Sequence, residues 1–292
     1  MNRIAIISAF LFIAAPLSFG ESGKIILTTS DYISGNTAVY DIATGKFTDN
    51  ILGHFQDAYV RAHGENVYII EGGDNSSIMK LDMNAPGKPL WQYSVGAGSN
   101  PHDIVFIPGE QFLKGYVLRY NKPALWVVNL DASKTADFKI GEIDLSAWKD
   151  ADGSPEAHLG FYHDGYVWIV LQRYDLSGFT PGTAVLLKID PKTDSVVDLD
   201  PVKAGVQGAD LIRRNPVAGS LIGEALYLAG TTYGASDEGV WSVDLRDPVN
   251  KQKVVLSEKT LGSPAAGLYV ANSAYGIVTA FDDSWNAVPK PF

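Results

Sequence analysis

Short runs of alternating apolar and polar residues, separated by turns rich in Gly, Asp, Asn and Pro, make up most of this chain. Alternation with a period of two predicts β-strands, and no stretch beyond residue 20 holds the 3.6-residue period of a helix for long. Runs rich in aromatic and β-branched residues recur, as in Val67-Tyr68-Ile69-Ile70 and Tyr166-Val167-Trp168-Ile169. The pattern therefore predicts an all-β protein with many turns.

One sequence phrase repeats along the chain: an apolar strand end, then Asp, then a turn. Its five copies are spaced 41 to 59 residues apart: Val39-Tyr40-Asp41, Lys80-Leu81-Asp82, Asn129-Leu130-Asp131, Lys188-Ile189-Asp190 and Ser242-Val243-Asp244. A period of roughly fifty residues with about four strands per unit is typical of a β-propeller. One blade cannot bury both of its faces alone, so blades must pack face to face.

We therefore predict a β-propeller of four-stranded blades with six recognisable blades. They lie at residues 24–52, 57–95, 100–146, 156–198, 207–258 and 263–292. The first lacks an innermost strand and the last ends after its third strand. Two alternatives stay open: a ring closed on six irregular blades, or an incomplete seven-bladed ring. We expect Tyr68, Trp168 and Tyr227 to lie between blades.

The first twenty residues read as a segment outside this fold. An apolar run from Ile4 to Phe19 follows Arg3, and Ser18-Phe19-Gly20 offers a cleavage site for a secretory signal peptide. The alternative is an uncleaved membrane anchor, for which the run is short. We predict a signal peptide at residues 1–20, a single β-propeller domain at 21–292 with no membrane span after cleavage, and a periplasmic or extracellular location.

Composition narrows the function classes. The 292 residues are 46% hydrophobic, and 23 Lys and Arg against 33 Asp and Glu give a formal net charge of −10. An acidic chain repels phosphate backbones, so we expect no nucleic-acid partner. The chain has no cysteine, which excludes a thiol nucleophile, disulfides, Cys-ligated zinc, iron–sulfur clusters and a lipobox anchor. We expect a monomer.

A first candidate site comes from aligning the innermost strands of five blades. The aligned column precedes an apolar strand in each blade and holds Asp57, Asp103, His158, Asp210 and Gly267. If these residues converge at the mouth of the central channel, they suit a hard cation or a polar ligand. The alternative is structural: each Asp accepts backbone N–H bonds in its own turn.

A second candidate column follows each second strand. It holds the aromatic residues Tyr32, Tyr120, Tyr174, Tyr233 and Trp285, and the second blade offers Glu71 in Glu71-Gly72-Gly73-Asp74-Asn75 instead. Arg119 and Arg173 precede two of the tyrosines. Aromatic faces with guanidinium groups suit a large flat or amphiphilic ligand. The alternative is that the tyrosines pack between blades.

Catalytic motifs are sparse. The sequence has no HExxH or HxxxH pair, no Gly-x-Ser-x-Gly elbow and no phosphate-binding glycine loop. Asp150-x-Asp152-Gly153 followed by Glu156 has part of the spacing of a calcium loop, although Asx-type turns show the same pattern. We expect no catalytic residue and no cofactor, with bound calcium as the alternative. A metal-dependent lactonase or hydrolase using Glu71, Asp103 and Asp210 is the enzymatic alternative.

Two phrases resemble the YncE-like, surface-layer-type bacterial β-propellers: Asn100-Pro101-His102-Asp103-Ile104-Val105-Phe106 and Ala38-Val39-Tyr40-Asp41-Ile42-Ala43-Thr44-Gly45-Lys46. The block from Asp144 to Arg173 adds to the resemblance, which covers most of residues 24–285. It implies a propeller, in that family generally of seven blades. Some relatives capture corrinoids or iron chelates for TonB-dependent transporters, and many of those are lipoproteins, whereas this chain lacks the lipobox cysteine.

The functional expectation is an exported, non-enzymatic propeller that binds a ligand or partner at the mouth of its central channel. The resemblance suggests an accessory of TonB-dependent uptake of a corrinoid or metal chelate, with an outer-membrane transporter as partner. A protein–protein interaction scaffold, which would use the rim or the top face, is the main non-enzymatic alternative.

Overall fold

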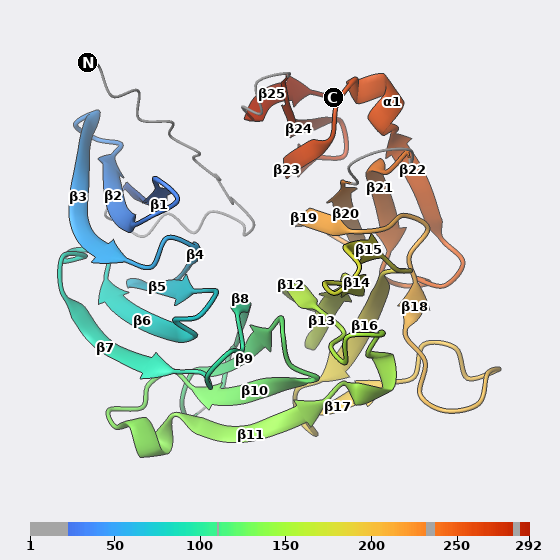
Figure 1. Ribbon diagram of the computed structural model, residues 1–292, viewed down its shortest axis with the longest axis horizontal. Coiled ribbons are helices and arrows are strands. Elements are labelled where there is room, and N and C mark those ends of the chain that lie inside the picture. Colours follow the sequence, from blue (N-terminus) through green and yellow to red (C-terminus); the bar gives the residue numbers. More distant parts are fainter. Residues whose placement is uncertain (1–22, 110, 232–236, 283–286) are drawn as a thin grey trace. The chain divides into compact units, whose positions relative to one another are not determined.

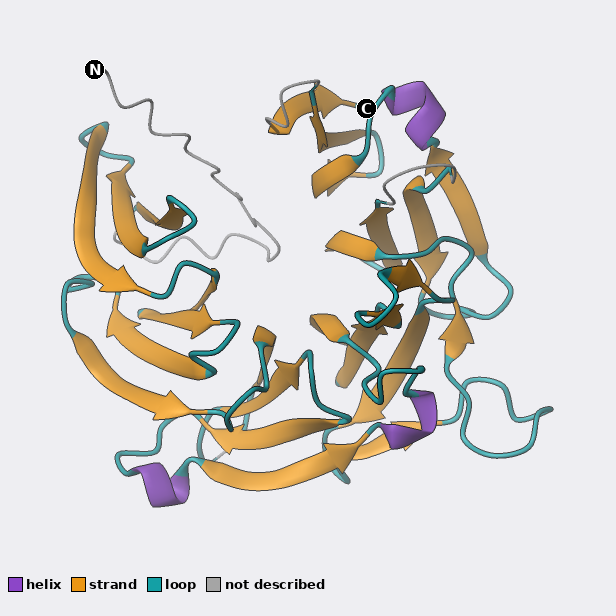
Figure 2. Cartoon of the chain, viewed as in Figure 1, coloured by secondary structure: helices purple, strands orange, loops and turns teal. Residues whose placement is uncertain are grey.

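The computed structural model describes residues 23–109, 111–231, 237–282 and 287–292. The predictions for residues 1–20, Tyr233 and Trp285 lie outside the described residues. Strands make up most of the described chain, and Figure 2 shows only three short helical segments: η1 (Thr135–Asp137), η2 (Ser146–Trp148) and α1 (Glu258–Leu261). No helix in these ranges has the length and apolar character needed to cross a membrane.

The described chain divides into two compact units. The first contains the residues up to Asn121 and Trp126–Gly141, and the second contains Lys122–Leu125 and Glu142–Phe292. The boundary therefore passes through the third sheet. Six antiparallel meander sheets, the blades of a β-propeller, account for most of the strands.

The first unit holds the first two blades and most of the third. Figure 1 shows the strands of each sheet side by side in chain order. Among the described residues the first sheet has three strands, in line with the prediction that residues 24–52 hold no innermost strand, and the next two sheets have four each. The strands are β1 (Lys24–Ser30), β2 (Gly35–Asp41) and β3 (Lys46–His54); β4 (Ala58–His63), β5 (Asn66–Glu71), β6 (Ser77–Asp82) and β7 (Pro89–Ser94); and β8 (Pro101–Ile107), β9 (Lys114–Arg119), β10 (Ala124–Asn129) and β11 (Lys139–Asp144).

The second unit holds the other three blades and a small hairpin, β14–β15. Its first sheet runs β12-β13-β16-β17 with β18 paired to β16, its second has four strands and its third has three. The strands are β12 (Ala157–His163), β13 (Tyr166–Leu171), β14 (Tyr174–Asp175), β15 (Thr180–Pro181), β16 (Val185–Asp190), β17 (Ser195–Val197) and β18 (Ala209–Asp210); β19 (Pro216–Ile222), β20 (Ala225–Gly230), β21 (Gly239–Asp244) and β22 (Gln252–Leu256); and β23 (Ala265–Asn272), β24 (Tyr275–Phe281) and β25 (Ala287–Pro291).

Four of the five repeated aspartates end equivalent strands and fix the turns that follow, whereas in the third blade β10 ends at Asn129, whose Oδ1 accepts from Asp131 N. The Oδ1 atom of Asp82 accepts from Asn84 N at 2.8 Å, and Asp190 Oδ1 accepts from Lys192 N at 2.9 Å. Asp41 and Asp244 make the same kind of bond to Thr44 N and Arg246 N. A short carboxylate that bonds backbone N–H groups two or three residues ahead is an Asx-type turn. The repeat is therefore a turn signal.

Alternation along β5 divides its side chains between two neighbouring blades. Val67 and Ile69 lie in a cluster with Met79, against Ile26 and Leu52 of the first blade. Tyr68 and Ile70 lie in another cluster with residues of the third blade, including Ile104, Val117 and Val128. Both faces of the strand are buried, because successive side chains of a β-strand point to opposite faces.

The second unit repeats this arrangement at β20. Leu226 and Leu228 join Trp168 of the fourth blade in one core cluster, whereas Ala229 joins Leu268 and Val278 of the sixth blade in another. Tyr227 packs against this second cluster. The prediction that Tyr68, Trp168 and Tyr227 lie between blades is confirmed.

The predicted start of the fifth blade is wrong. Leu211 and Ile212 were expected in its innermost strand, but that strand is β19, which begins at Pro216. Asp210 belongs instead to β18, which pairs with β16 of the fourth blade. The sequence is misleading here because the apolar pair Leu211-Ile212 follows Asp210, as the start of an innermost strand would, although it lies in no strand.

We expect Tyr68→Ala to lower the free energy of unfolding by roughly 3–5 kcal/mol, because it empties a site that is fully buried between two blades. Tyr68→Phe should change it by less than about 1 kcal/mol, because the Tyr68 hydroxyl is buried without a hydrogen-bond partner. Urea denaturation of both variants measures this, with Tyr275→Ala at a site 72% exposed as the control. A small effect of Tyr68→Ala would contradict the packing.

Candidate functional site

The residue just before an innermost strand shares one backbone hydrogen bond in five blades. Its carbonyl accepts, over 2.7–3.2 Å, from an N–H at the end of the second strand, either the residue just after that strand or, in the sixth blade, its last residue Phe281. The residues at this position are Asp57, Asn100, Glu156, Asn215 and Pro264. Asn100, Glu156 and Asn215 have positive φ, from 44° to 49°, a conformation that Asn tolerates well and Glu rarely adopts.

The predicted acidic column is therefore out of register. Of Asp57, Asp103, His158, Asp210 and Gly267, only Asp57 occupies the shared starting position. Asp103 lies three residues after Asn100, and His158 lies two residues after Glu156; an irregularity in strand pairing at His102 accounts for one residue of the first offset, and one at His158 accounts for part of the second. A bulge of this kind inserts one unpaired residue, which alternation in a sequence does not reveal.

Asp103 makes a buried ion pair. Its Oδ1 lies 2.7 Å from Arg61 Nε and also accepts from the Ile104 N–H at 2.7 Å. The Asp103 side chain is 1% exposed and that of Arg61 is 14% exposed. The pair joins the innermost strands β4 and β8 of two neighbouring blades.

The first unit brings three rings together at the start of β4 and β8. The His102 ring stacks on Tyr120 with centroids 4.0 Å apart and an interplanar angle of 21°, and it meets the Tyr59 ring at 5.1 Å. Tyr120 is buried, whereas Tyr59 and His102 are half-buried. We call the set Asp57, Tyr59, Asn100, His102 and Tyr120 the β4–β8 surface.

Two oxygen atoms flank a glycine beside these rings. A β-carbon on Gly72 would lie 2.9 Å from Asp57 Oδ2 and 3.0 Å from Asn100 Oδ1. Asn100 Oδ1 also accepts from Gly73 N at 2.6 Å. Partial desolvation raises the pKa of the Asp57 carboxyl, although Asp57 remains exposed. Burial, together with the charge of Asp57, raises the pKa of Tyr59. The β4–β8 surface thus combines ring faces with oxygen acceptors.

Glu71 is the last residue of β5, and its carboxylate holds together the loop between β5 and β6. Its carboxylate accepts from Phe55 N at 2.9 Å, Asn75 Nδ2 at 2.5 Å, Gln92 Nε2 at 2.8 Å and the Ser77 hydroxyl. The side chain is 2% exposed. Four donors from separate parts of the chain therefore engage the Glu71 carboxylate inside the protein.

The aromatic column is also out of register. Tyr120 directly follows β9, but Gln172, not Tyr174, occupies the equivalent place after β13. Arg119 ends β9 and lies over the Trp126 ring at 4.6 Å, whereas Arg173 lies beyond β13. Tyr32, in the turn after β1, is 73% exposed.

The remaining predicted residues of the second unit each bind a different partner. His158 is buried, with Nε2 3.3 Å from the Val217 carbonyl oxygen. Asp210 is exposed, and its carbonyl accepts from Gln252 Nε2. Tyr174 N donates to Glu156 Oε2 at 3.0 Å, which places Tyr174 beside an acidic group.

That acidic group is a trio. Asp150, Asp152 and Glu156 each bring a carboxylate oxygen within 4.8 Å of the other two. Glu156 is completely buried. Burial, followed by the charges of Asp150 and Asp152, raises the pKa of Glu156 to about 9. These three residues have the oxygen donors that a hard metal ion prefers.

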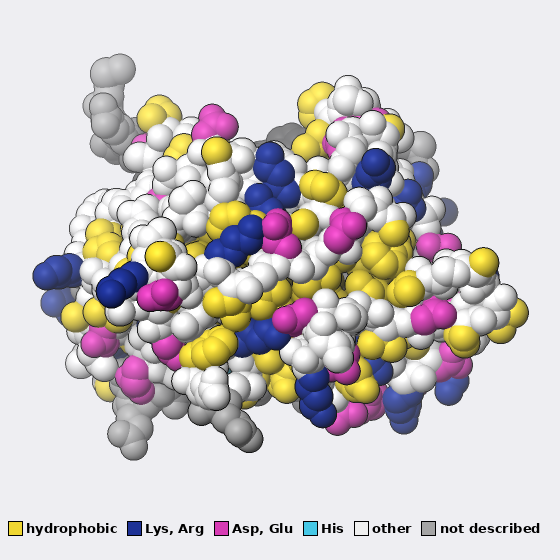
Figure 3. Space-filling model, turned by 90° about the horizontal axis from the view of Figure 1, so that it is seen from below, with side chains coloured by type: hydrophobic (Ala, Val, Ile, Leu, Met, Phe, Trp, Pro, Cys, Tyr) yellow, Lys and Arg dark blue, Asp and Glu magenta, His cyan; other side chains and the backbone are white. Residues whose placement is uncertain are grey.

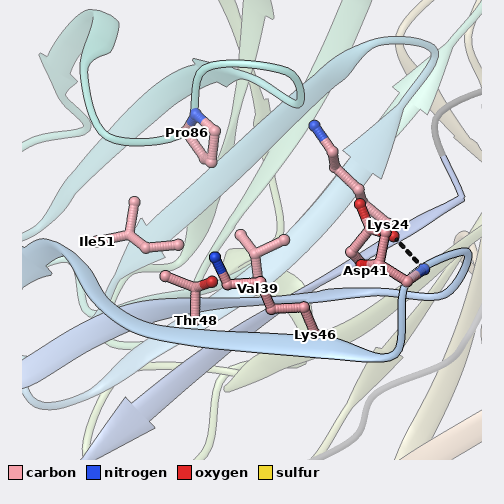
Figure 4. Close-up of a pocket in the computed structure, with 8 residues that line it drawn as sticks. Lys24, Val39, Asp41, Lys46, Thr48, Ile51 and Pro86 are labelled. Atoms are coloured by element: carbon pink, nitrogen blue, oxygen red, sulfur yellow. Dashed lines mark hydrogen bonds between the residues drawn. The ribbon is translucent and has the colours of Figure 1, made fainter.

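Two shallow hollows lie elsewhere in the first unit, and neither includes a predicted site residue. Figure 4 shows the first, of about 260 Å³, where Lys24, Asp41 and Pro86 line an open recess. The Asp41 carboxylate there is engaged by its own turn. Lys80, Trp91 and Asp131 line the second. On the face in Figure 3, acidic and basic side chains are interspersed, so the acidic excess forms no continuous patch there.

Sequence reasoning identified Asp57 and Tyr120 but missed Tyr59, Asn100 and His102. Asn100 and His102 stand in Asn100-Pro101-His102-Asp103, the phrase that begins β8. An Asn before a Pro at the start of a strand is a signal for a special backbone conformation, and it was available in the sequence.

No protein-family model matches the chain, and no curated protein matches it in sequence. Solved structures do match in fold. A chain of the Mitotic Checkpoint Complex has a TM-score of 0.57 at 10% identity, over 90% of this chain and 71% of that chain. Hydrazine synthase of Kuenenia stuttgartiensis has a TM-score of 0.58 at 11% identity, over 89% and 71%.

A third match is the extracellular domain of a one-component system from B. thetaiotaomicron. Its TM-score is 0.55 at 13% identity, over 90% of this chain and 30% of that chain. Identities this low show the fold, a β-propeller, and not the activity.

We expect Asp103→Ala to lower the free energy of unfolding by about 3 kcal/mol, because it removes the carboxylate from the largely buried Arg61 guanidinium. Asp74→Ala, at an exposed position of the same unit, should change it by less than about 0.5 kcal/mol. Urea denaturation compares the two. Equal stability of Asp103→Ala and the wild type would contradict a structural role for the pair.

The raised pKa of Glu156 also predicts that the free energy of unfolding depends on pH. The pKa rises from 4.5 to about 9 on folding, so the stability that Glu156 contributes is full below pH 4.5 and is lost as pH rises toward 9. In chelator-treated protein, the wild type should lose up to about 1.4 kcal/mol per pH unit relative to Glu156→Gln. Urea denaturation at several pH values between 5 and 9 measures the difference, with the exposed Glu65→Gln as control.

Proposed function

We propose that this chain is an exported, non-enzymatic β-propeller that binds a ligand through the β4–β8 surface. The observation that carries the proposal is the contact of Tyr59, His102 and Tyr120 beside the oxygens of Asp57 and Asn100. Half-buried rings stack on flat ligands, and oxygen acceptors next to them select ligands with hydrogen-bond donors. The export half of the proposal rests on the apolar run from Ile4 to Phe19.

We further propose that the ligand is a flat metal chelate, with a corrinoid as the best fit. A corrinoid carries amide donors around a large ring, whereas haem carries carboxylates that Asp57 would repel. The phrase around Asn100 that resembles YncE-like propellers supports this choice, because some of those relatives capture corrinoids for TonB-dependent transporters. In this proposal the protein acts in the periplasm or outside the cell as an accessory of such a transporter.

The test is ligand binding to the purified chain, measured as a thermal shift with cobalamin, haem and a ferric chelate. A ligand present at 100 times its Kd adds about 2.7 kcal/mol of stability, which raises Tm by roughly 5 °C. We expect cobalamin to give this rise. His102→Ala should weaken binding at least tenfold, because the imidazole contacts both tyrosine rings, and Tyr275→Ala should bind as the wild type does.

A cooperative melt that none of the three compounds shifts would contradict the proposal. A shift that His102→Ala leaves unchanged would show that the ligand binds elsewhere on the protein. Hydrolysis of a lactone panel, lost on chelation, would instead favour the enzymatic alternative.

A further inference from the structure

The segment between η2 and β12 holds a group of carboxylates that the proposed function does not use. Backbone bonds position the group: Asp152 Oδ1 accepts from Ser154 N at 3.0 Å, and Asp152 Oδ2 accepts from Leu176 N at 2.9 Å. Asp150 Oδ1 accepts from Asp152 N at 3.2 Å. These bonds bring the carboxylates of Asp150, Asp152 and Glu156 together.

A second observation points to a ligand at this group. Glu156 is 0% exposed, and its Oε2 accepts from Tyr174 N, but its Oε1 is buried and has no hydrogen-bond partner among the described residues. The Oδ2 atom of Asp150 is also buried and also has no hydrogen-bond partner among the described residues. Buried carboxylate oxygens without donors are strongly destabilising unless a positive charge or a proton reaches them.

The described side chains supply no such charge. No Lys, Arg or His of the described ranges forms a salt bridge with Asp150, Asp152 or Glu156. Three carboxylates within 4.8 Å of one another would repel strongly if all were ionised. A cation at their centre would satisfy the two unpartnered oxygens and offset the repulsion together.

We propose that Asp150, Asp152 and Glu156 bind a calcium ion, which fastens the segment 150–156 to the hairpin β14–β15. The donors are all carboxylate oxygens, which suit a hard ion and not zinc or copper. Oxygens on opposite sides of calcium lie up to about 5.2 Å apart, so three atoms within 4.8 Å fit around one ion. Magnesium demands an octahedral site and retains several waters, which does not suit the buried Glu156.

The bound ion would stabilise the hairpin β14–β15 more than other parts of the unit. Glu156 already holds the backbone of Tyr174, at the start of the hairpin, and Asp152 holds the backbone of Leu176, just after β14. Phe179, between its two strands, is 74% exposed. Metal binding should therefore protect the hairpin from cleavage by chymotrypsin after Phe179.

The test is isothermal titration of the chelator-stripped full chain with calcium chloride, and separately with magnesium chloride. We expect calcium binding with a Kd between about 10⁻⁶ and 10⁻³ M, tighter than for magnesium. Glu156→Gln and Asp150→Asn should each weaken binding at least tenfold. Asp175→Asn is the matched control, because Asp175 lies in the same hairpin but its carboxylate bonds Ser177, and it should bind calcium as the wild type does.

A second readout does not depend on the variants folding. In wild-type protein, calcium should slow chymotrypsin cleavage after Phe179 and raise Tm, and terbium should bind competitively with calcium. The absence of binding heat and of protection at millimolar calcium would overturn the proposal and leave a proton shared between Asp150 and Glu156. Unchanged calcium affinity in both folded variants would also overturn it. Neither result bears on ligand binding at the β4–β8 surface.

Discussion

Side chains that alternate along β5 pack against two different blades, with Val67 and Ile69 on one side and Tyr68 and Ile70 on the other. The same division recurs at β20 in the second unit. A blade therefore gains most of its burial from its neighbours and little from itself, as in other repeat proteins. This constraint makes strands such as β5 apolar on both faces, and the polar side chains that lie in the innermost strands, such as Arg61 in β4 and Asp103 in β8, are paired with each other.

The turns and loops between the strands of a blade are also held by regular backbone contacts. Aspartates such as Asp82 and Asp190 close the turns after third strands, and the carbonyl of the residue before an innermost strand binds the backbone at the end of the second strand. The residue that supplies this carbonyl is fixed in place, so its side chain is presented beside its neighbours with little freedom. Asp57 and Asn100 flank Gly72 for this reason, and Glu156 faces Asp150 and Asp152.

Three buried carboxylates show how surroundings decide the role of a residue type. Glu71 is engaged by four donors, Asp103 is paired with Arg61, and Glu156 has one donor and one unpartnered oxygen. The first two stabilise loops and strands from inside. Only the third has the unmet electrostatic demand that a ligand can supply. A sequence shows three acids, and only their contacts distinguish them.

The sequence by itself determined the all-β class, the propeller repeat, the three strands of the first blade in the described part of the chain and the residues between blades. These features are local or periodic, and alternation and Asp turns encode them directly. Tertiary structure alone decided the register of the candidate sites. Asp103 and His158 lie three and two residues beyond the shared position, and Asp210 lies in the extra strand β18, so these residues are outside the expected column. The contacts of Tyr59 with His102, and of Glu156 with Asp150, join residues brought together by the packing of neighbouring blades and by loop closure, which one sequence does not specify.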